Sequence, residues 1–194
     1  MNGTTALLAL VEVFDRAGVP YMIVGSYSSN FYGIPRATRD ADLVVHLASA
    51  AWGRLPAMLP EGIELDAQMS FEMVTSTRRE LLRVRDSLFQ IELFRLSDDP
   101  YDLTRFERRR KVEIFPCMGV FVPSAEDVIV QKLRWCQAAG RSKDFADVVG
   151  VMQVQGPLLD WTYVEKWCVA HGTMALLAEA KAEAVWAWAE DDAK

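Results

Sequence analysis

The sequence predicts an α+β protein in which a mixed half of strands and helices is followed by a helical half. Up to about residue 122, short β-prone segments alternate with helical patterns, and strands dominate from about 63 to 96. After Pro123 the pattern becomes helical, starting at Ser124 and Asp127, which resemble a capping box. We therefore expect an α/β core over residues 1–122 and a helical region over 123–194 packed on that core.

The length and composition are those of an ordinary globular protein. The chain has 194 residues, of which 51% are hydrophobic and 25% are charged, enough for one sizeable domain or a domain with a small appendage. Its formal net charge of −6 argues against a protein that binds nucleic acid through bulk positive charge. Basic residues gather locally, as at 105–111, where either a solvated helix face or a patch for a phosphate-bearing substrate would fit.

Cysteine usage and apolar runs indicate a cytoplasmic protein. Three cysteines lie far apart without a CxxC pair, which argues against a disulfide framework or a zinc site. The N-terminus lacks the basic region and long apolar core of a signal peptide. No apolar stretch reaches the length of about 18 residues that marks a membrane span. We expect a reducing cytoplasm and no membrane partner.

Apolar spacing and turn residues place the elements in order. Helical periodicity and stop residues predict helices over 5–17, 26–32, 48–59, 125–139, 143–154, 161–170 and 173–189. β-Prone runs predict strands over 21–24, 40–46, 79–84, 89–96, 112–115 and 120–122. The polar residues at 85–87 separate two of these strands and predict a hairpin.

Two acidic residues stand inside an apolar strand. Asp40 and Asp42 share one face of the strand over 40–46, because side chains alternate between the two faces. Each carboxylate costs free energy to desolvate unless its charge is compensated. The compensation is either a structural pairing with Arg36 or Arg39 or a bound metal ion.

A glycine–serine pair precedes these aspartates. Gly25 and Ser26 follow the strand over 21–24 and open the helix over 26–32, where backbone N–H groups and a hydroxyl suit a phosphate. Two carboxylates on one strand face suit Mg²⁺, which prefers oxygen ligands and is commonly shared with substrate phosphates. The turn and the paired aspartates together point to a site for a metal-bound phosphate.

The order of these motifs resembles the signature of the nucleotidyltransferase superfamily that includes DNA polymerase β. Val24, Gly25 and Ser26 are followed by thirteen residues and then by Asp40 and Asp42 in an apolar strand. The resemblance implies a nucleotidyltransferase-like mixed β-sheet flanked by helices. Members often carry an arginine soon after the glycine–serine pair, whereas here the arginines come later, at positions 36 and 39.

The superfamily also has a third carboxylate on a later strand. Glu92 matches it, because Ile91 and Leu93 flank it in an apolar strand. Glu64 is its competitor, although its apolar surroundings are less regular.

The helical half is similar to that of the AbiEii-type nucleotidyltransferases, a subgroup that includes toxins of toxin–antitoxin systems. The similarity rests on residues 131–134, which include Lys132, and on the segment 140–147, which includes Lys143, Asp144 and Asp147. On the residues alone, each of these could instead be a surface lysine or an acidic helix start. The tail from about 156 adds nothing to the resemblance.

The resemblance implies a set of roles. Asp40, Asp42 and Glu92 would be the catalytic, metal-binding carboxylates, and two Mg²⁺ ions are implied. The nucleotide-binding residues would be Gly25, Ser26, Arg39, Lys132, Lys143 and Asp144. The implied reaction moves a nucleoside monophosphate from a nucleoside triphosphate to a hydroxyl of an RNA, a protein or a small molecule, and an antitoxin is a possible partner.

Two other functions compete with this one. The first is a catalytically silent nucleotide-binding or partner module with the same fold. The second is a metal-dependent glycosyltransferase that uses Asp40 and Asp42 on a nucleotide-sugar, but it leaves Gly25, Ser26 and Glu92 without a role.

Overall fold

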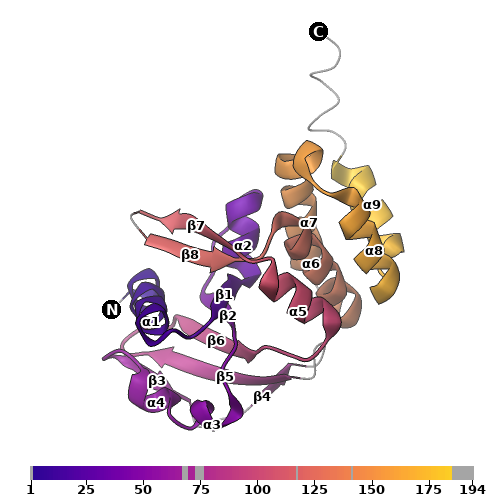
Figure 1. The fold of residues 1–194 in the computed structure, drawn as a ribbon. Helices are drawn as coiled ribbons and strands as arrows, with labels where there is room; N and C mark the ends of the chain where they lie inside the picture. Colours follow the sequence, from indigo (N-terminus) through magenta and orange to yellow (C-terminus); the bar gives the residue numbers. More distant parts are fainter. Residues whose placement is uncertain (1, 67–69, 73–76, 117, 141, 185–194) are drawn as a thin grey trace. The chain divides into compact units, whose positions relative to one another are not determined.

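The computed structural model describes residues 2–66, 70–72, 77–116, 118–140 and 142–184. The chain divides into two compact units (Figure 1). The sheet unit consists of Met1–Tyr27 and Ala37–Val122, and the helical unit consists of Ser28–Arg36 and the residues from Pro123 onward. The segment Ser28–Arg36 thus belongs with helices that lie about a hundred residues later in the sequence.

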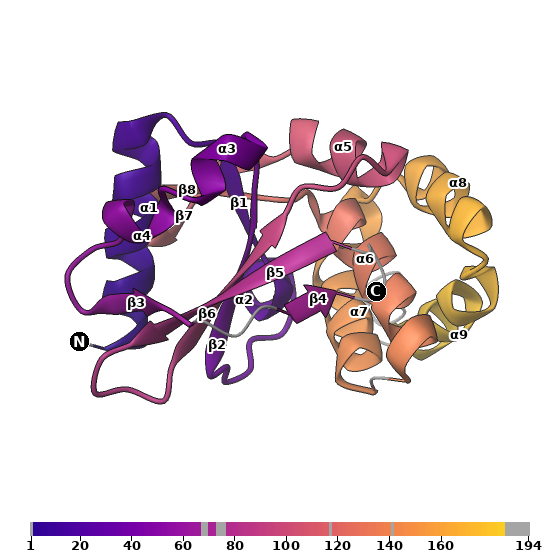
Figure 2. The ribbon, with the colours of Figure 1, turned by 90° about the horizontal axis from the view of Figure 1, so that it is seen from below.

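A mixed β-sheet forms the centre of the sheet unit. Its strands are β1 (Tyr21–Val24), β2 (Asp40–Val45), β3 (Ile63–Leu65), β4 (Ser70–Glu72), β5 (Thr77–Val84) and β6 (Gln90–Arg95). The order is β1-β2-β6-β5-β3, and β4 also pairs with β5. The β2–β6 pair is parallel and the other pairs are antiparallel, so the sheet is mixed as the sequence predicted. Figure 2 shows β5 and β6 as the two long neighbouring strands of this sheet.

One face of the sheet is apolar and covered by helices. Leu43 of β2, Leu82 of β5 and Ile91 of β6 point to this face and are buried. The helices α1 (Gly3–Ala17) and α3 (Ser49–Trp52) lie against it: the Phe89 ring packs on Gly3 of α1, and the Arg95 guanidinium lies 4.3 Å from the centre of the Trp52 ring. This burial fixes the register of β2 and β6, since a one-residue slip would move every side chain to the opposite face.

The opposite face is divided between an apolar cluster and a polar region. Met22, Val24, Val44 and Phe94 pack there against Phe106 of α5 (Pro100–Glu107). The neighbouring two-stranded sheet of β7 (Arg110–Phe115) and β8 (Met118–Val122) adds Phe121 to this cluster. The polar region of this face carries the predicted carboxylates.

Among its described residues, the helical unit contains four helices and the end of a fifth. Its helices are α6 (Ala125–Ala139), α7 (Ser142–Gln155), α8 (Trp161–His171) and α9 (Met174–Ala184), with a 3₁₀ turn at Gly156–Leu158 and the latter part of α2 (Gly25–Tyr32). The predicted cap of α6 is confirmed: Ser124 Oγ accepts from the Asp127 N–H at 3.3 Å and donates to the Asp127 carboxylate at 2.9 Å. Gly33 lies against the backbone of α7 at Gly150, where a Cβ would meet backbone atoms at 2.8–3.1 Å.

Two predictions for local structure were wrong. The single helix over 48–59 is two short helices, α3 and α4 (Leu55–Met58), because Gly53 and Pro56 interrupt it. The helix α5 was missed, although Asp99 caps it by accepting from two backbone N–H groups and Pro100 occupies its first position.

The basic run at 105–111 is not one helix face, because it spans the end of α5 and the start of β7. Arg105 is buried beside Asp102, with 2.9 Å between Nε and the carboxylate.

Two further predictions concern the ends of helices and the membrane. The part of the predicted last helix over 185–189 lies outside the described residues. Among the helices that the structure describes, none combines the length and apolar character needed to cross a bilayer.

Candidate active site

The pairing of β2 with β6 brings the predicted carboxylates to one face of the sheet. Asp42 is directly opposite Glu92, and Asp40 is opposite Gln90 in the same parallel ladder. Residues opposite each other in neighbouring strands point to the same face, and the strands lie about 4.8 Å apart. Residues separated by fifty positions in the sequence therefore become immediate neighbours.

The Gly25 turn lies directly against the Asp42 carboxylate. Val24, the last residue of β1, is opposite Asp42, so the chain leaves the sheet beside this aspartate. Gly25 has a φ of 63°, a left-handed conformation that glycine adopts without strain, and a methyl group on its Cα would overlap Asp42 Oδ2. Ser26 is buried at the start of α2. The turn and the carboxylate are thus brought together because residue 25 is glycine.

Glu92 forms an ion pair with an arginine that the sequence did not predict. Arg79 Nη1 donates to Glu92 Oε2 at 2.8 Å from the neighbouring strand β5. The Arg79 side chain is 35% exposed and that of Glu92 is 19% exposed. Arg79 lies one cross-strand diagonal from Glu92, because Arg79 is opposite Phe94 and Leu81 is opposite Glu92.

Asp40 has its own polar surroundings. Thr38 Oγ1 donates a hydrogen bond of 2.7 Å to Asp40 Oδ1. Burial raises the pKa of Tyr27 above its ordinary value, and the charge of Asp40 raises it further. The Tyr27 ring also contacts Phe115, with 5.8 Å between the ring centres. The sequence did not predict that Thr38 and Tyr27 interact with Asp40, because these interactions depend on the path of the chain between α2 and β2.

The donor chemistry of this face fits Mg²⁺. All three predicted ligands offer carboxylate oxygens, and each of the three side chains keeps part of its surface accessible. Within the described ranges, however, no three acidic, histidine or cysteine side chains converge as a ready metal cluster. Because Arg79 donates to Glu92 Oε2, a metal ion bound at this carboxylate would lie close to the guanidinium charge.

Glu64, the alternative third carboxylate, lies farther from the aspartates. It is on β3, which is separated from β6 by β5, and it is opposite Arg83. Its side chain is exposed and accepts from Arg85 Nη2 at 2.9 Å. The register therefore favours Glu92 as the partner of Asp42.

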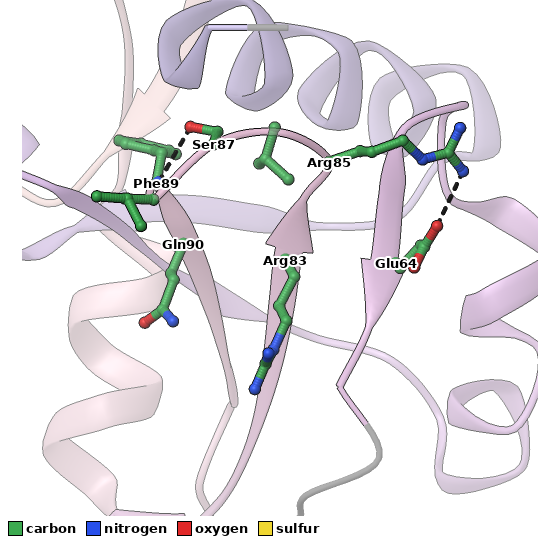
Figure 3. Close-up of a pocket in the computed structure, with 8 residues that line it drawn as sticks. Glu64, Arg83, Arg85, Ser87, Phe89 and Gln90 are labelled. Carbon is green, nitrogen blue, oxygen red and sulfur yellow. Dashed lines mark hydrogen bonds and ion pairs between the residues drawn. The ribbon is translucent and has the colours of Figure 1, made fainter.

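A cavity of about 340 Å³ lies at the turn between β5 and β6 (Figure 3). Figure 3 shows the Arg85–Glu64 ion pair on one side of it and the hydrogen bond from the Phe89 N–H to Ser87 Oγ on the other. The lining residues are Glu64, Arg83, Val84, Arg85, Ser87, Leu88, Phe89 and Gln90. Glu64, the alternative third carboxylate, lines this cavity. Asp40, Asp42 and Glu92 do not line it, so the cavity is not the predicted site.

The basic and acidic residues predicted in the helical half form a buried ion-pair cluster. Lys132 Nζ donates to Asp144 Oδ1 at 2.8 Å and to Asp147 Oδ2 at 2.7 Å. Arg36 binds the same Asp147 with two hydrogen bonds, of 2.7 and 2.9 Å, and Ser29 Oγ donates to it at 3.2 Å. We call Arg36, Lys132, Asp144 and Asp147 the ion-pair cluster.

The ion-pair cluster compensates its own charge. Burial alone would raise the pKa of Asp147, but hydrogen bonds and charges from Arg36 and Lys132 outweigh it, so this pKa lies below its ordinary value. Lys132 and Asp144 are only 4% and 1% exposed. The predicted role of Lys132 at the triphosphate would therefore compete with two carboxylates that already bind its ammonium group.

The other predicted nucleotide-binding residues are at the surface. Arg39 is exposed at the entry to β2, and Lys143 is exposed in the first turn of α7. Their roles, and those of Lys132 and Asp144 toward a nucleotide, stay predictions.

No protein-family model matches this chain, and no curated protein matches it. Solved structures do. The solution structure of the antibiotic-resistance factor ANT(2'')-Ia is 14% identical, with a TM-score of 0.61 over 92% of this chain and 97% of that one. The crystal structure of ANT(2'')-Ia with adenylyl-2''-tobramycin has the same identity and TM-score over 88% and 97%.

A third similar structure is the antigenic nucleotidyltransferase-like protein from Paracoccidioides brasiliensis. It is 22% identical, with a TM-score of 0.53 over 76% of this chain and 74% of that one. At such identities the likeness establishes the fold, which is that of the nucleotidyltransferases, as the sequence predicted. The AbiEii-type subgroup stays a prediction.

Proposed function

We propose that the protein is a Mg²⁺-dependent nucleotidyltransferase, which moves a nucleoside monophosphate from a nucleoside triphosphate to a hydroxyl acceptor. The observation that carries the proposal is the arrangement around Asp42. Its carboxylate is opposite Glu92 in the parallel ladder and lies against the Gly25 turn, so the acidic residues and the turn that we propose for the phosphates lie together. The nucleotidyltransferase fold of the solved structures supports the same reading.

Asp40, Asp42 and Glu92 are the proposed ligands of Mg²⁺, two ions being implied by the superfamily. When bound, Mg²⁺ would neutralise phosphate charge and make the acceptor hydroxyl more acidic. Carboxylate oxygens are the hard donors that Mg²⁺ prefers.

The chain's own residues would orient the substrates. The backbone N–H groups at Gly25 and Ser26 open α2 and suit the anionic oxygens of the triphosphate, and Arg39 is the proposed nearby cation. Lys132, Lys143 and Asp144 complete the proposed nucleotide-binding set.

The proposed chemistry is a single substitution at phosphorus. The acceptor oxygen bonds to the α-phosphorus while the bond to the leaving pyrophosphate breaks. Glu92, if it acts as in members of the superfamily, is the group that we propose to accept the hydroxyl proton.

A small molecule with free hydroxyls is the first acceptor to test. ANT(2'')-Ia was solved with adenylyl-2''-tobramycin, a small molecule that carries an adenylyl group. An RNA end or a protein hydroxyl are the other candidates. Adenosine triphosphate is, for the same reason, the first nucleotide to try.

The test is turnover with each labelled nucleoside triphosphate. The protein is incubated with Mg²⁺, one nucleotide and panels of hydroxylated small molecules, RNA and protein, and pyrophosphate release and label transfer are followed. Label transfer that requires Mg²⁺ and is absent from Asp42→Asn supports the proposal. Nucleotide binding without transfer to any acceptor would leave only the second candidate, a silent nucleotide-binding module, which the Arg79–Glu92 ion pair favours.

The biological role that we propose to test is that of a toxin in a toxin–antitoxin system. It rests on the AbiEii-type likeness of the segments 131–134 and 140–147. Expression of the chain alone and with the product of its adjacent reading frame checks it, because a toxin arrests growth only when its antitoxin is missing.

A further inference from the structure

The Arg79–Glu92 ion pair lies at the centre of the proposed active site and has no role in the reaction as described above. Arg79 Nη1 is 2.8 Å from Glu92 Oε2, and Glu92 is the register partner of Asp42. An arginine guanidinium is always charged in proteins, so it is a permanent counter-ion for this carboxylate. It therefore stands where a bound cation would otherwise compensate Glu92.

The surroundings of this pair allow it to open. Both side chains retain exposed surface, 35% for Arg79 and 19% for Glu92, so water can replace either partner. Ion pairs that are accessible to solvent contribute less net stability than their Coulomb attraction alone would give. In contrast, the Arg95–Glu80 pair on the opposite face of the same two strands is reinforced by the Trp52 ring, which lies 4.3 Å from the Arg95 guanidinium.

We propose that Arg79 is a positioning residue that competes with the metal for Glu92. In the metal-free protein it holds the Glu92 carboxylate and compensates its charge beside Asp42. Metal binding displaces the guanidinium from Glu92, which then turns to the ion. This inference rests on the proposed function, since it assigns Glu92 to a metal.

The competition has a measurable consequence. A cation that approaches Glu92 meets the positive charge of Arg79 at close range and competes with it for the carboxylate. Removing that charge should therefore tighten metal binding. If Arg79 merely supported the strand, its removal would weaken metal binding. The expected gain is about tenfold, a Coulomb effect of ordinary size for charges a few ångströms apart near a protein surface.

The experiment measures the affinity of the nucleotide-free protein for Mn²⁺, a paramagnetic substitute for Mg²⁺, by electron paramagnetic resonance. The variants are Arg79→Gln, Arg79→Lys, Glu92→Gln and the double variant Arg79→Gln/Glu92→Gln. The matched control is Arg83→Gln: Arg83 is on the same strand and face, is 65% exposed and also pairs with a carboxylate, that of Asp66. Arg83 is the other cross-strand diagonal neighbour of Glu92, because it is opposite Gln90, but its guanidinium pairs with Asp66 and not with Glu92. Thermal unfolding verifies that each variant is folded.

We expect Arg79→Gln to bind Mn²⁺ about tenfold more tightly than wild type, Arg79→Lys to fall between the two, and Arg83→Gln to stay within about twofold. The double variant should bind no more tightly than Glu92→Gln, because the competition needs Glu92. Equal or weaker binding by Arg79→Gln, compared with Arg83→Gln, overturns the inference.

Failure of the inference is distinguishable from failure of the proposed function. If wild type binds Mn²⁺ and transfers label but Arg79→Gln behaves like the control, only the inference is wrong. If no variant binds Mn²⁺ and no nucleotide turns over, both are wrong.

Discussion

The sheet unit and the helical unit each contain a group of carboxylates beside basic residues, and they differ in burial and in charge balance. In the ion-pair cluster, Lys132 and Arg36 bind Asp144 and Asp147 at 2.7–2.9 Å, and both aspartates and the lysine are buried. On the sheet face, Asp40, Asp42 and Glu92 are each partly exposed. The same residue types thus form a closed structural element in one place and an accessible acidic surface in the other.

The difference predicts which carboxylates are available to bind a metal ion or a substrate. A buried ion pair is strongly destabilised when one partner is removed, because an uncompensated charge is left in a poorly solvated place. In contrast, a cation that binds beside an accessible group of carboxylates reduces the repulsion between their charges. The comparison therefore predicts that substitutions in the ion-pair cluster alter folding, and that substitutions on the sheet face alter catalysis.

The largest expected effect is that of Asp42→Asn. Loss of one charged oxygen ligand should reduce Mg²⁺-dependent transfer on the order of a thousandfold, with the fold kept, because the side chain is similar in size. Steady-state rates and circular dichroism are the measurements. Full activity, or a variant that unfolds at room temperature, would contradict the assignment of Asp42 as a ligand.

Lys132→Met should destabilise the helical unit. Removing the ammonium group takes the Lys132 ion pair away from the buried Asp144 and leaves Asp147 with Arg36, so we expect a loss of about 3–5 kcal/mol in the free energy of unfolding. Urea denaturation measures it, and Lys143→Met, at an exposed position of the same region, should stay within about 0.5 kcal/mol.

The same variant sharpens the comparison through nucleotide binding. The sequence predicts that loss of Lys132 weakens triphosphate binding by about 1–3 kcal/mol, and monophosphate binding less. A stable Lys132→Met that shows this selective weakening would place Lys132 at the nucleotide, and would contradict its role as a structural ion-pair partner.

Glu92→Gln should leave nucleotide affinity nearly intact and reduce turnover about a hundredfold, as expected for an interaction that matters mainly in the transition state. Glu64→Gln is the matched control. Glu64 lies on the same face of the sheet, but it is two strands away from β6 and pairs with Arg85. Its turnover should change less than about threefold. The reverse pattern would move the third carboxylate to β3.

The smallest effect is the pH dependence of Asp147. Its pKa lies below the ordinary value of 3.8, so the folded state favours the charged carboxylate. The resulting stabilisation is fully present above pH 3.8 and is lost as the pH falls through the lowered pKa. We expect Asp147→Asn to be less stable than wild type by about 2 kcal/mol at pH 7, and the difference to shrink in acid. A difference that is the same at pH 3 and pH 7 would show that its charge is not what stabilises the fold.

Much of the fold could be predicted because its signals are local. Gly18 ends helix α1 in the left-handed conformation, and Ser124 caps α6, as the sequence indicated. The alternation of apolar residues in β2 and β6 located the two strands that carry the carboxylates. The two errors, at 48–59 and at α5, fall where the sequence carries local signals of a helix break and a helix start: Gly53 with Pro56, and Asp99 with Pro100.

The sequence by itself determined the kind of site: a glycine at a turn, two aspartates on one strand face and a glutamate flanked by apolar residues. These features follow from backbone periodicity and from the chemistry of single residues. Only the tertiary structure decided which charges meet. The parallel pairing of β2 with β6 placed Glu92 beside Asp42, cross-strand packing gave Glu92 the partner Arg79, and the packing of residues 28–36 with α6 and α7 gave Asp147 the partner Arg36. A charge pair depends on the distance between side chains that are remote in the sequence, and no local pattern encodes that distance.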